Sequence, residues 1–112
     1  MNRQRFEQLV RDAIDAVPEP FVRELARVPV LVQDEPPPGE SGLYGLYHGV
    51  ALDERFGSEP LEPSTITIYM RTLLDHCEDE IELEREVRIT LLHELGHHLG
   101  LDEDDLDRLG YA

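Results

Sequence analysis

Three of the chain's five histidines lie in one short stretch, HELGHHLG, at residues 93–100. His93 and His97 are four positions apart, so on a helix their rings lie one turn apart on one side and can reach one metal ion. Glu94 lies about 100° round the helix from His93, where it reaches the same space without being a ligand. This pattern, HExxH, suits hydrolysis at zinc, because the metal lowers the pKa of a bound water and a neighbouring carboxylate takes its proton.

A catalytic zinc usually has a third protein ligand and keeps its fourth position for water. Gly100 allows the chain to reverse after the helix, which brings the acidic residues that follow back towards the metal. Asp102, Glu103 and Asp104 all carry suitable carboxylates. Asp102 is expected to cap a following helix, and Glu103 is six residues after His97, a spacing used by a related pattern. Glu103 is therefore the preferred third ligand, and Asp102 and Asp104 stay open as alternatives.

The element that must position these residues is a long helix, expected from about residue 80 to 98 or 99, with Gly100 where a left-handed residue typically ends a helix. His93 and His97 point nearly opposite the centre of its apolar arc, so they face away from the main core contact. His98 falls within the arc and is predicted to be a hydrogen-bonded core or interface histidine. The arc is formed by Ile81, Val87, Leu91, Leu92, Leu95 and Leu99.

The remaining pattern predicts short elements around this helix. Residues 3–16 have the period of an amphipathic helix, and residues 65–70, TITIYM, alternate as a strand with a solvated face does. Further elements are expected at 19–26 (a helical turn), 28–32 (a buried strand), 43–50 (a strand interrupted by glycines) and 103–109 (a helix), with loops at 34–42 and 53–64. This order predicts a single α+β domain over residues 1–112, with a three- to four-stranded sheet packed on the helix that carries HExxH.

Composition excludes several classes of function. Ten arginines, no lysines and 25 acidic residues give a net charge of -15, which repels nucleic acids and anionic membranes. The lack of lysine removes Schiff-base and P-loop chemistry. The N-terminus has no apolar core of a signal peptide, and no run is long enough to cross a bilayer. Cys77 is a lone cysteine, so a reducing compartment, by default the cytoplasm, is expected.

The motif also supports a resemblance to known proteins. HELGHHLGLDE is similar to HExxHxxGxx(H/D), the extended motif of metzincin-like zincins, with Glu103 in the last position and no Met-turn methionine after it. The chain more closely resembles a family of short bacterial zincin-like proteins, minimal metallopeptidases first grouped as a domain of unknown function. That likeness covers GLYHGVAL, STITIYMRTLL, EREVRITLLHELGHHLG and LDEDDLDRLGYA.

The resemblance implies zinc ligands at His93, His97 and Glu103, a general base at Glu94, and a zincin-like minimal fold. It also implies that an edge strand lines the active-site cleft and pairs with an extended substrate. Residues 65–70 are expected to be that strand, because their alternation suits an edge and they come shortly before the helix.

Five other residues have less specific roles. His48 and His76 are expected to be solvated or structural, although His48 on a strand can line the cleft. Gly96 allows close approach either by substrate or by a packed neighbour. Thr90 shares the face of the metal site, where its hydroxyl reaches water or bonds back along the helix. Tyr111 is a weak candidate for stabilising an oxyanion.

These observations favour a zinc-dependent hydrolase with one Zn²⁺ per chain, most consistent with a metallopeptidase that cleaves extended or unfolded peptides. One alternative is a non-catalytic module in which the metal supports the fold or a partner interface. Glu94 argues against it, because a structural zinc needs no base. Another is a hydrolase of a small-molecule amide or ester. No nucleic-acid or membrane partner is expected, and the native metal, substrate, oligomeric state and need for a partner stay open.

Overall fold

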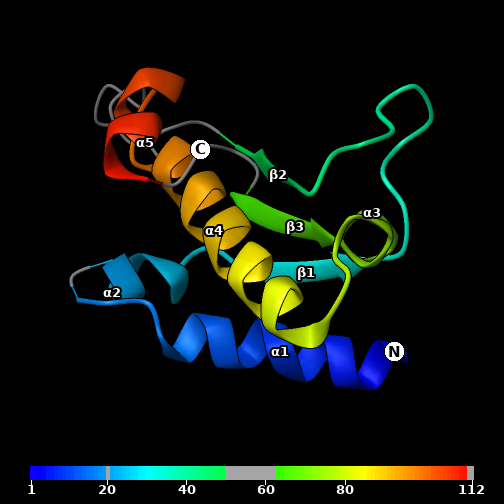
Figure 1. The fold of residues 1–112 in the computed structure, drawn as a ribbon. Helices are drawn as coiled ribbons and strands as arrows, with labels where there is room; N and C mark the ends of the chain where they lie inside the picture. The colour runs from blue at the N-terminus through cyan, green and yellow to red at the C-terminus, as the bar shows by residue number, and fades with distance from the viewer. Residues whose placement is uncertain (20, 50–62, 111–112) are drawn as a thin grey trace.

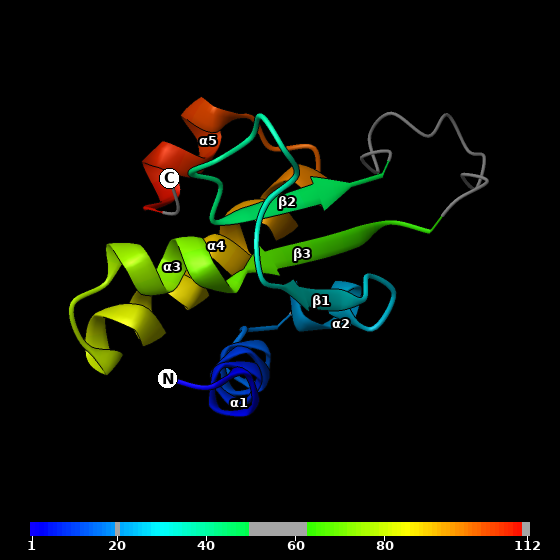
Figure 2. The ribbon, with the colours of Figure 1, turned by 90° about the vertical axis from the view of Figure 1, so that its right-hand side faces the viewer.

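A computed structural model describes residues 1–19, 21–49 and 63–110, and it has the predicted α+β architecture. The elements are α1 (Arg3–Asp15), α2 (Phe21–Leu25), β1 (Val30–Gln33), β2 (Gly45–His48), β3 (Thr65–Tyr69), α3 (Met70–His76), α4 (Glu80–His98) and α5 (Glu103–Leu109). Helix α4 crosses one face of the sheet and contacts α1, α3, β2 and β3 (Figures 1 and 2). The core between these elements includes Phe6, Leu9, Val10, Ala13, Ile66, Ile68, Leu73, Leu83, Val87, Leu91 and Leu95.

The sheet has the order β1-β3-β2, with β1 parallel and β2 antiparallel to β3. The expectation that residues 65–70 form an edge strand with a solvated face is therefore wrong. Ile66 and Ile68 are fully buried, and Thr65 and Thr67 on the other face are half-buried. Alternation in sequence shows that the two faces differ, but it does not show whether a strand has one partner or two. Met70 already begins α3, a helix not expected from the sequence.

The two outer strands among the described residues are β1 and β2. A buried strand is expected at 28–32. The structure has a strand there, but it is not buried, since β1 alternates between half-buried and exposed residues and Leu31 is 44% exposed. Val28, which is buried, lies just before β1. A β-branched run therefore marked the strand correctly, but Leu31 lies on the same face of the sheet as Thr67 of β3, opposite the face of the buried isoleucines.

Helix α4 begins at a capped residue and buries one side. The Asp79 side chain accepts a hydrogen bond of 2.8 Å from the Glu82 N–H, which satisfies a free donor of the first turn. The predicted apolar arc includes Ile81, but Ile81 is 81% exposed, so the prediction that it faces the core is wrong. It has the same angle on the helix as Leu99, at the edge of the arc. Leu99 is half-buried near α5, whereas no described element covers this edge in the first turn.

The chain reverses after α4 through a left-handed glycine. Gly100 has φ +87°, and the N–H groups of Gly100 and Leu101 donate to the carbonyls of His97 and Gly96, the pattern of a Schellman motif. Asp102 then caps α5 and shares a capping box with Asp105, as expected. The turn brings the first residue of α5 back beside the last turns of α4.

Gly96 lies where α5 packs on α4. A Cβ atom at Gly96 would lie 2.3 Å from Cδ2 of Leu106, a fully buried side chain of α5. Of the two interpretations of this glycine, the structure supports packing by a neighbouring element. Gly96 therefore sets how closely the two helices approach.

Two expectations fall largely on residues that the structure does not describe. The loop predicted over 53–64 lies outside the described residues except for 63 and 64, and Tyr111 lies outside them too. In the described parts of the chain, every helix is too short or too polar to cross a membrane.

Candidate metal centre

Three donor atoms converge where α4 meets the start of α5. Nε2 of His93 and Nε2 of His97 are 3.2 Å apart, and Oε1 of Glu103 lies 3.3 Å from the first and 3.0 Å from the second. Two ligands each about 2.1 Å from a tetrahedral zinc are about 3.4 Å apart. The two imidazole nitrogens and the carboxylate oxygen therefore have a chemistry and a spacing that fit a divalent ion.

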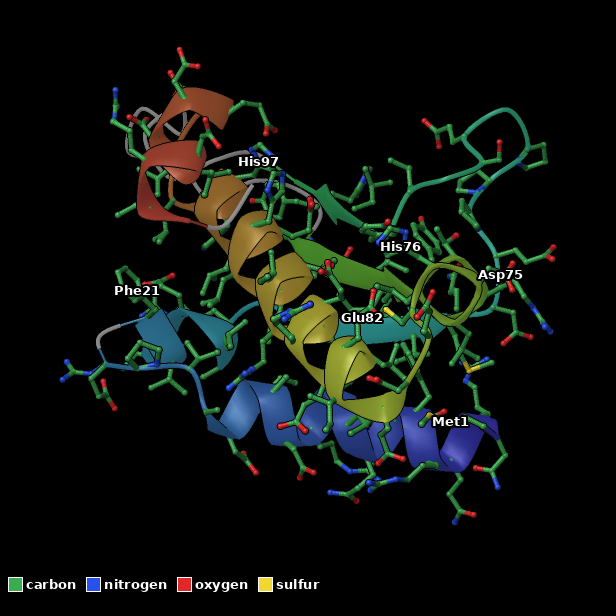
Figure 3. All side chains as sticks on the ribbon, in the orientation of Figure 1. Met1, Phe21, Asp75, His76, Glu82 and His97 are labelled. Carbon is green, nitrogen blue, oxygen red and sulfur yellow. The ribbon has the colours of Figure 1, made fainter. Side chains whose placement is uncertain are left out.

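The donors are positioned by the helix and by the turn that follows it. His93 and His97 project from one side of α4, and Figure 3 shows His97 on its C-terminal turns. Their side chains are 20% and 31% exposed, so water and ligands can reach them. Glu103 is the first residue of α5, and its side chain is 67% exposed. Asp102 accepts a hydrogen bond from the Asp105 N–H instead, and of these two neighbouring carboxylates Glu103 is the one with an oxygen beside both imidazoles.

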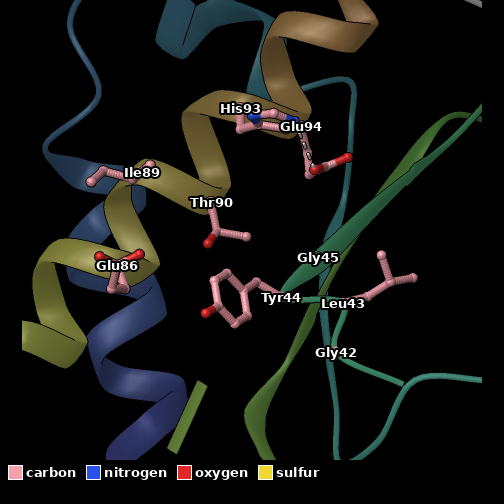
Figure 4. Close-up of a pocket in the computed structure, with 9 residues that line it drawn as sticks. All are labelled: Gly42, Leu43, Tyr44, Gly45, Glu86, Ile89, Thr90, His93 and Glu94. Carbon is pink, nitrogen blue, oxygen red and sulfur yellow. Dashed lines mark ion pairs between the residues drawn. The ribbon is translucent and has the colours of Figure 1, made fainter. Parts of the chain in front are cut away.

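Glu94 lies next to the donors and is buried between α4 and the sheet. Its Oε1 accepts a 2.8 Å hydrogen bond from the backbone N–H of Tyr47 on β2, and its Oε2 lies 3.9 Å from Nε2 of His93 (Figure 4). Burial raises the pKa of Glu94, although the two nearby histidines and the Tyr47 N–H act in the opposite direction. A carboxylate with a raised pKa is a better proton acceptor than an exposed one.

The side chain of Tyr47 belongs to a second set of contacts, which the sequence did not reveal. Its hydroxyl lies 2.9 Å from Oγ of Ser64 and 2.9 Å from Nδ1 of His98, and Nε2 of His98 lies 3.1 Å from Oε2 of Glu24. His98 is 2% exposed, so the prediction of a hydrogen-bonded core histidine is confirmed. Tyr47 thus joins β2 to α4 through its side chain and to Glu94 through its backbone.

A cavity of about 240 Å³ lies between α4 and β2 and reaches the metal centre. Thr90 on α4 borders it, and a Cβ atom at Gly45 of β2 would lie 2.7 Å from Cγ2 of Thr90. The strand that lines the site is therefore β2 and not residues 65–70 as expected. The cavity is lined by Gly42, Leu43, Tyr44, Gly45, Glu86, Ile89, Thr90, His93 and Glu94 (Figure 4).

The two histidines outside the 93–100 stretch do not belong to this centre. His48 is exposed at the end of β2 and does not border the cavity. His76 is exposed at the end of α3, and its ring centroid lies 5.1 Å from that of Tyr44. Both positions agree with the solvated or structural role expected from the sequence.

Comparison with known proteins gives the class of this protein. The sequence profile of the zincin-like metallopeptidase family matches residues 25–111, so the chain belongs to that family. Its fold and its HExxH cluster of His93, Glu94 and His97 agree with this membership, and together they indicate a divalent metal site.

One solved structure with a similar fold is that of a conserved hypothetical protein from Thermo thermophilus. It is 31% identical in sequence, the alignment covers 88% of this chain and 94% of that chain, and the TM-score is 0.65. Among curated proteins, none matches the chain.

Proposed function

We propose that this protein is a zinc-dependent peptidase, in which His93, His97 and Glu103 hold the ion and Glu94 is the general base. The observation that carries the proposal is the convergence of the three donor atoms, 3.0–3.3 Å apart, beside a buried carboxylate. Two histidines and one glutamate are a ligand set of catalytic zinc sites. When bound, zinc supplies Lewis acidity, which makes a water molecule acidic enough to lose a proton near neutral pH.

Glu94 is held in an orientation that suits proton transfer. The Tyr47 N–H occupies Oε1, which leaves Oε2 on the side of His93. Because burial raises its pKa, Glu94 accepts a proton from water and can return it to the leaving amine of a cleaved peptide. The same carboxylate acts as base and then as acid.

The position of β2 supports an extended peptide as substrate. Tyr44 accepts a hydrogen bond from the Tyr69 N–H, so in this antiparallel ladder the backbone groups of Tyr47 point away from β3. Glu94 binds the outward N–H of Tyr47, which places it at the outer edge of β2. A peptide lying along this edge passes directly beside Glu94 and the metal centre.

The test is hydrolysis of a diverse peptide library by the zinc-loaded protein and by its Glu94→Gln variant. We expect cleavage by the parent and a loss of at least about 100-fold in the variant, at equal zinc content, because a general base contributes on the order of 10²–10⁴ in rate. Equal activity in the two proteins excludes Glu94 as the base. Absence of cleavage by the zinc-loaded parent contradicts peptidase function.

A further inference from the structure

The cavity beside the metal centre has the reacting groups at one end and a carboxylate at the other. His93 and Glu94 lie at the first end, and Glu86 lies two helical turns earlier on α4 (Figure 4). Seven residues of helix separate Glu86 from His93, which corresponds to about 10 Å along the axis. Glu86 is therefore too far away to be a metal ligand, but it borders the space that a substrate side chain would enter.

The size of the cavity suits a single side chain. Its volume of about 240 Å³ is below the roughly 300–1,000 Å³ of sites for drug-sized ligands. An extended lysine or arginine side chain places its charge about 6–7 Å from its Cα atom, so one whose backbone lies beside Glu94 can reach Glu86. Leu43, Tyr44 and Ile89 offer apolar surface to the aliphatic stem.

The charge of Glu86 is available to such a side chain. Within the described residues, no arginine forms an ion pair with Glu86, and this carboxylate is half-buried. The pKa of the Tyr44 phenol is raised mainly by burial and next by the negative charge of Glu86. This effect agrees with the position of Tyr44 and Glu86 at the same end of the cavity. The Tyr44 ring also offers a face to a guanidinium group.

We propose that the cavity between α4 and β2 binds a cationic side chain of the substrate, with Glu86 as the residue that selects arginine or lysine beside the scissile bond. This inference rests on the proposed peptidase function. A neutral or acidic side chain in the same place leaves the Glu86 carboxylate desolvated without a partner or meets like charge, so it binds less well.

The test measures peptide binding, which does not require turnover. The zinc-loaded Glu94→Gln protein is titrated with two blocked alanine-based peptides that carry either one arginine or one citrulline, which has nearly the same shape without the charge. We expect the arginine peptide to bind about fivefold more tightly, the upper range for an accessible ion pair. Adding Glu86→Gln should remove this difference by weakening the binding of the arginine peptide, whereas the citrulline peptide should bind no less tightly than before, because it no longer desolvates an unpaired carboxylate.

Glu84→Gln is the matched control, because Glu84 is exposed on the same helix, does not border the cavity and carries the same charge. In this control the preference for arginine should persist. Equal affinity for the two peptides, no binding of either, or an equal loss of preference in both variants overturns the assignment. None of these results depends on cleavage, so they are distinct from a failure of the peptidase proposal.

Discussion

The backbone N–H of Tyr47 on β2 donates a 2.8 Å hydrogen bond to Oε1 of Glu94 on α4. This bond ties the proposed base to the outer edge of the sheet, and the Tyr47 hydroxyl anchors the same residue to Ser64 and His98. The position of Glu94 therefore depends on how firmly β2 is held against α4. The contact joins residues 47 positions apart.

Tyr47→Phe should destabilise the protein by about 1–3 kcal/mol, because it removes the hydroxyl beside the buried Nδ1 of His98. Chemical denaturation of the metal-free protein measures the effect. Tyr44→Phe is the control, since the Tyr44 hydroxyl makes no hydrogen bond within the described part of the chain. Equal stability of the two variants would show that the contacts of the Tyr47 hydroxyl contribute nothing.

Glu103→Gln should weaken zinc binding strongly, because it removes a charged donor. Loss of a group that only orients a metal ligand already weakens metal binding roughly 10–100-fold, and the effect of Glu103→Gln should be larger. Asp104→Asn, one position later on the exposed start of α5, should change the affinity by no more than about twofold. Competition with a chromophoric chelator measures both. The reverse order of effects would assign the third ligand to Asp104.

Gly96→Ala should lower stability by about 1–3 kcal/mol and weaken zinc binding, because the new methyl group displaces the fully buried side chain of Leu106 in α5, the helix that begins with Glu103. Adding Leu106→Ala removes the atoms that clash. The zinc affinity of the double variant should then exceed the value expected if the two single effects were additive. Strict additivity would contradict the proposed coupling between this packing contact and the metal centre.

Acid should destabilise α5 through Asp105. The hydrogen bond from the Asp102 N–H, together with Arg108, lowers the pKa of Asp105 below its ordinary 3.8. Its ionised form therefore stabilises the fold above about pH 4, and this contribution is lost as the pH falls through the lowered pKa. In metal-free protein, Asp105→Asn should lose less stability than the parent between pH 5 and 3, measured by urea unfolding. Parallel profiles would be inconsistent with this role.

The arrangement of residues 93–103 could be predicted because each step in it is local. The spacing of His93 and His97, the left-handed turn at Gly100 and the cap at Asp102 depend on helix geometry within a few residues. Together they bring Glu103 back beside the two imidazoles. The short distance along the chain leaves little freedom for another arrangement.

The features that could not be predicted depend on contacts between distant segments. The central position of β3 is set by pairing with both β1 and β2, and the period of TITIYM contains no information on the number of partners. Likewise, nothing in the sequence near Tyr47 shows that its N–H would meet Glu94 or its hydroxyl His98. Such contacts exist only once the sheet has assembled on α4.

The most direct test of the central claim is the coordination sphere of the zinc-loaded protein, determined by crystallography with anomalous scattering at the zinc edge. We predict one ion per chain, bound by His93, His97 and Glu103, with solvent in the remaining position. A site closed by a fourth protein ligand would indicate a structural role for the metal. Imidazoles that bind no ion when zinc is in excess would contradict the account.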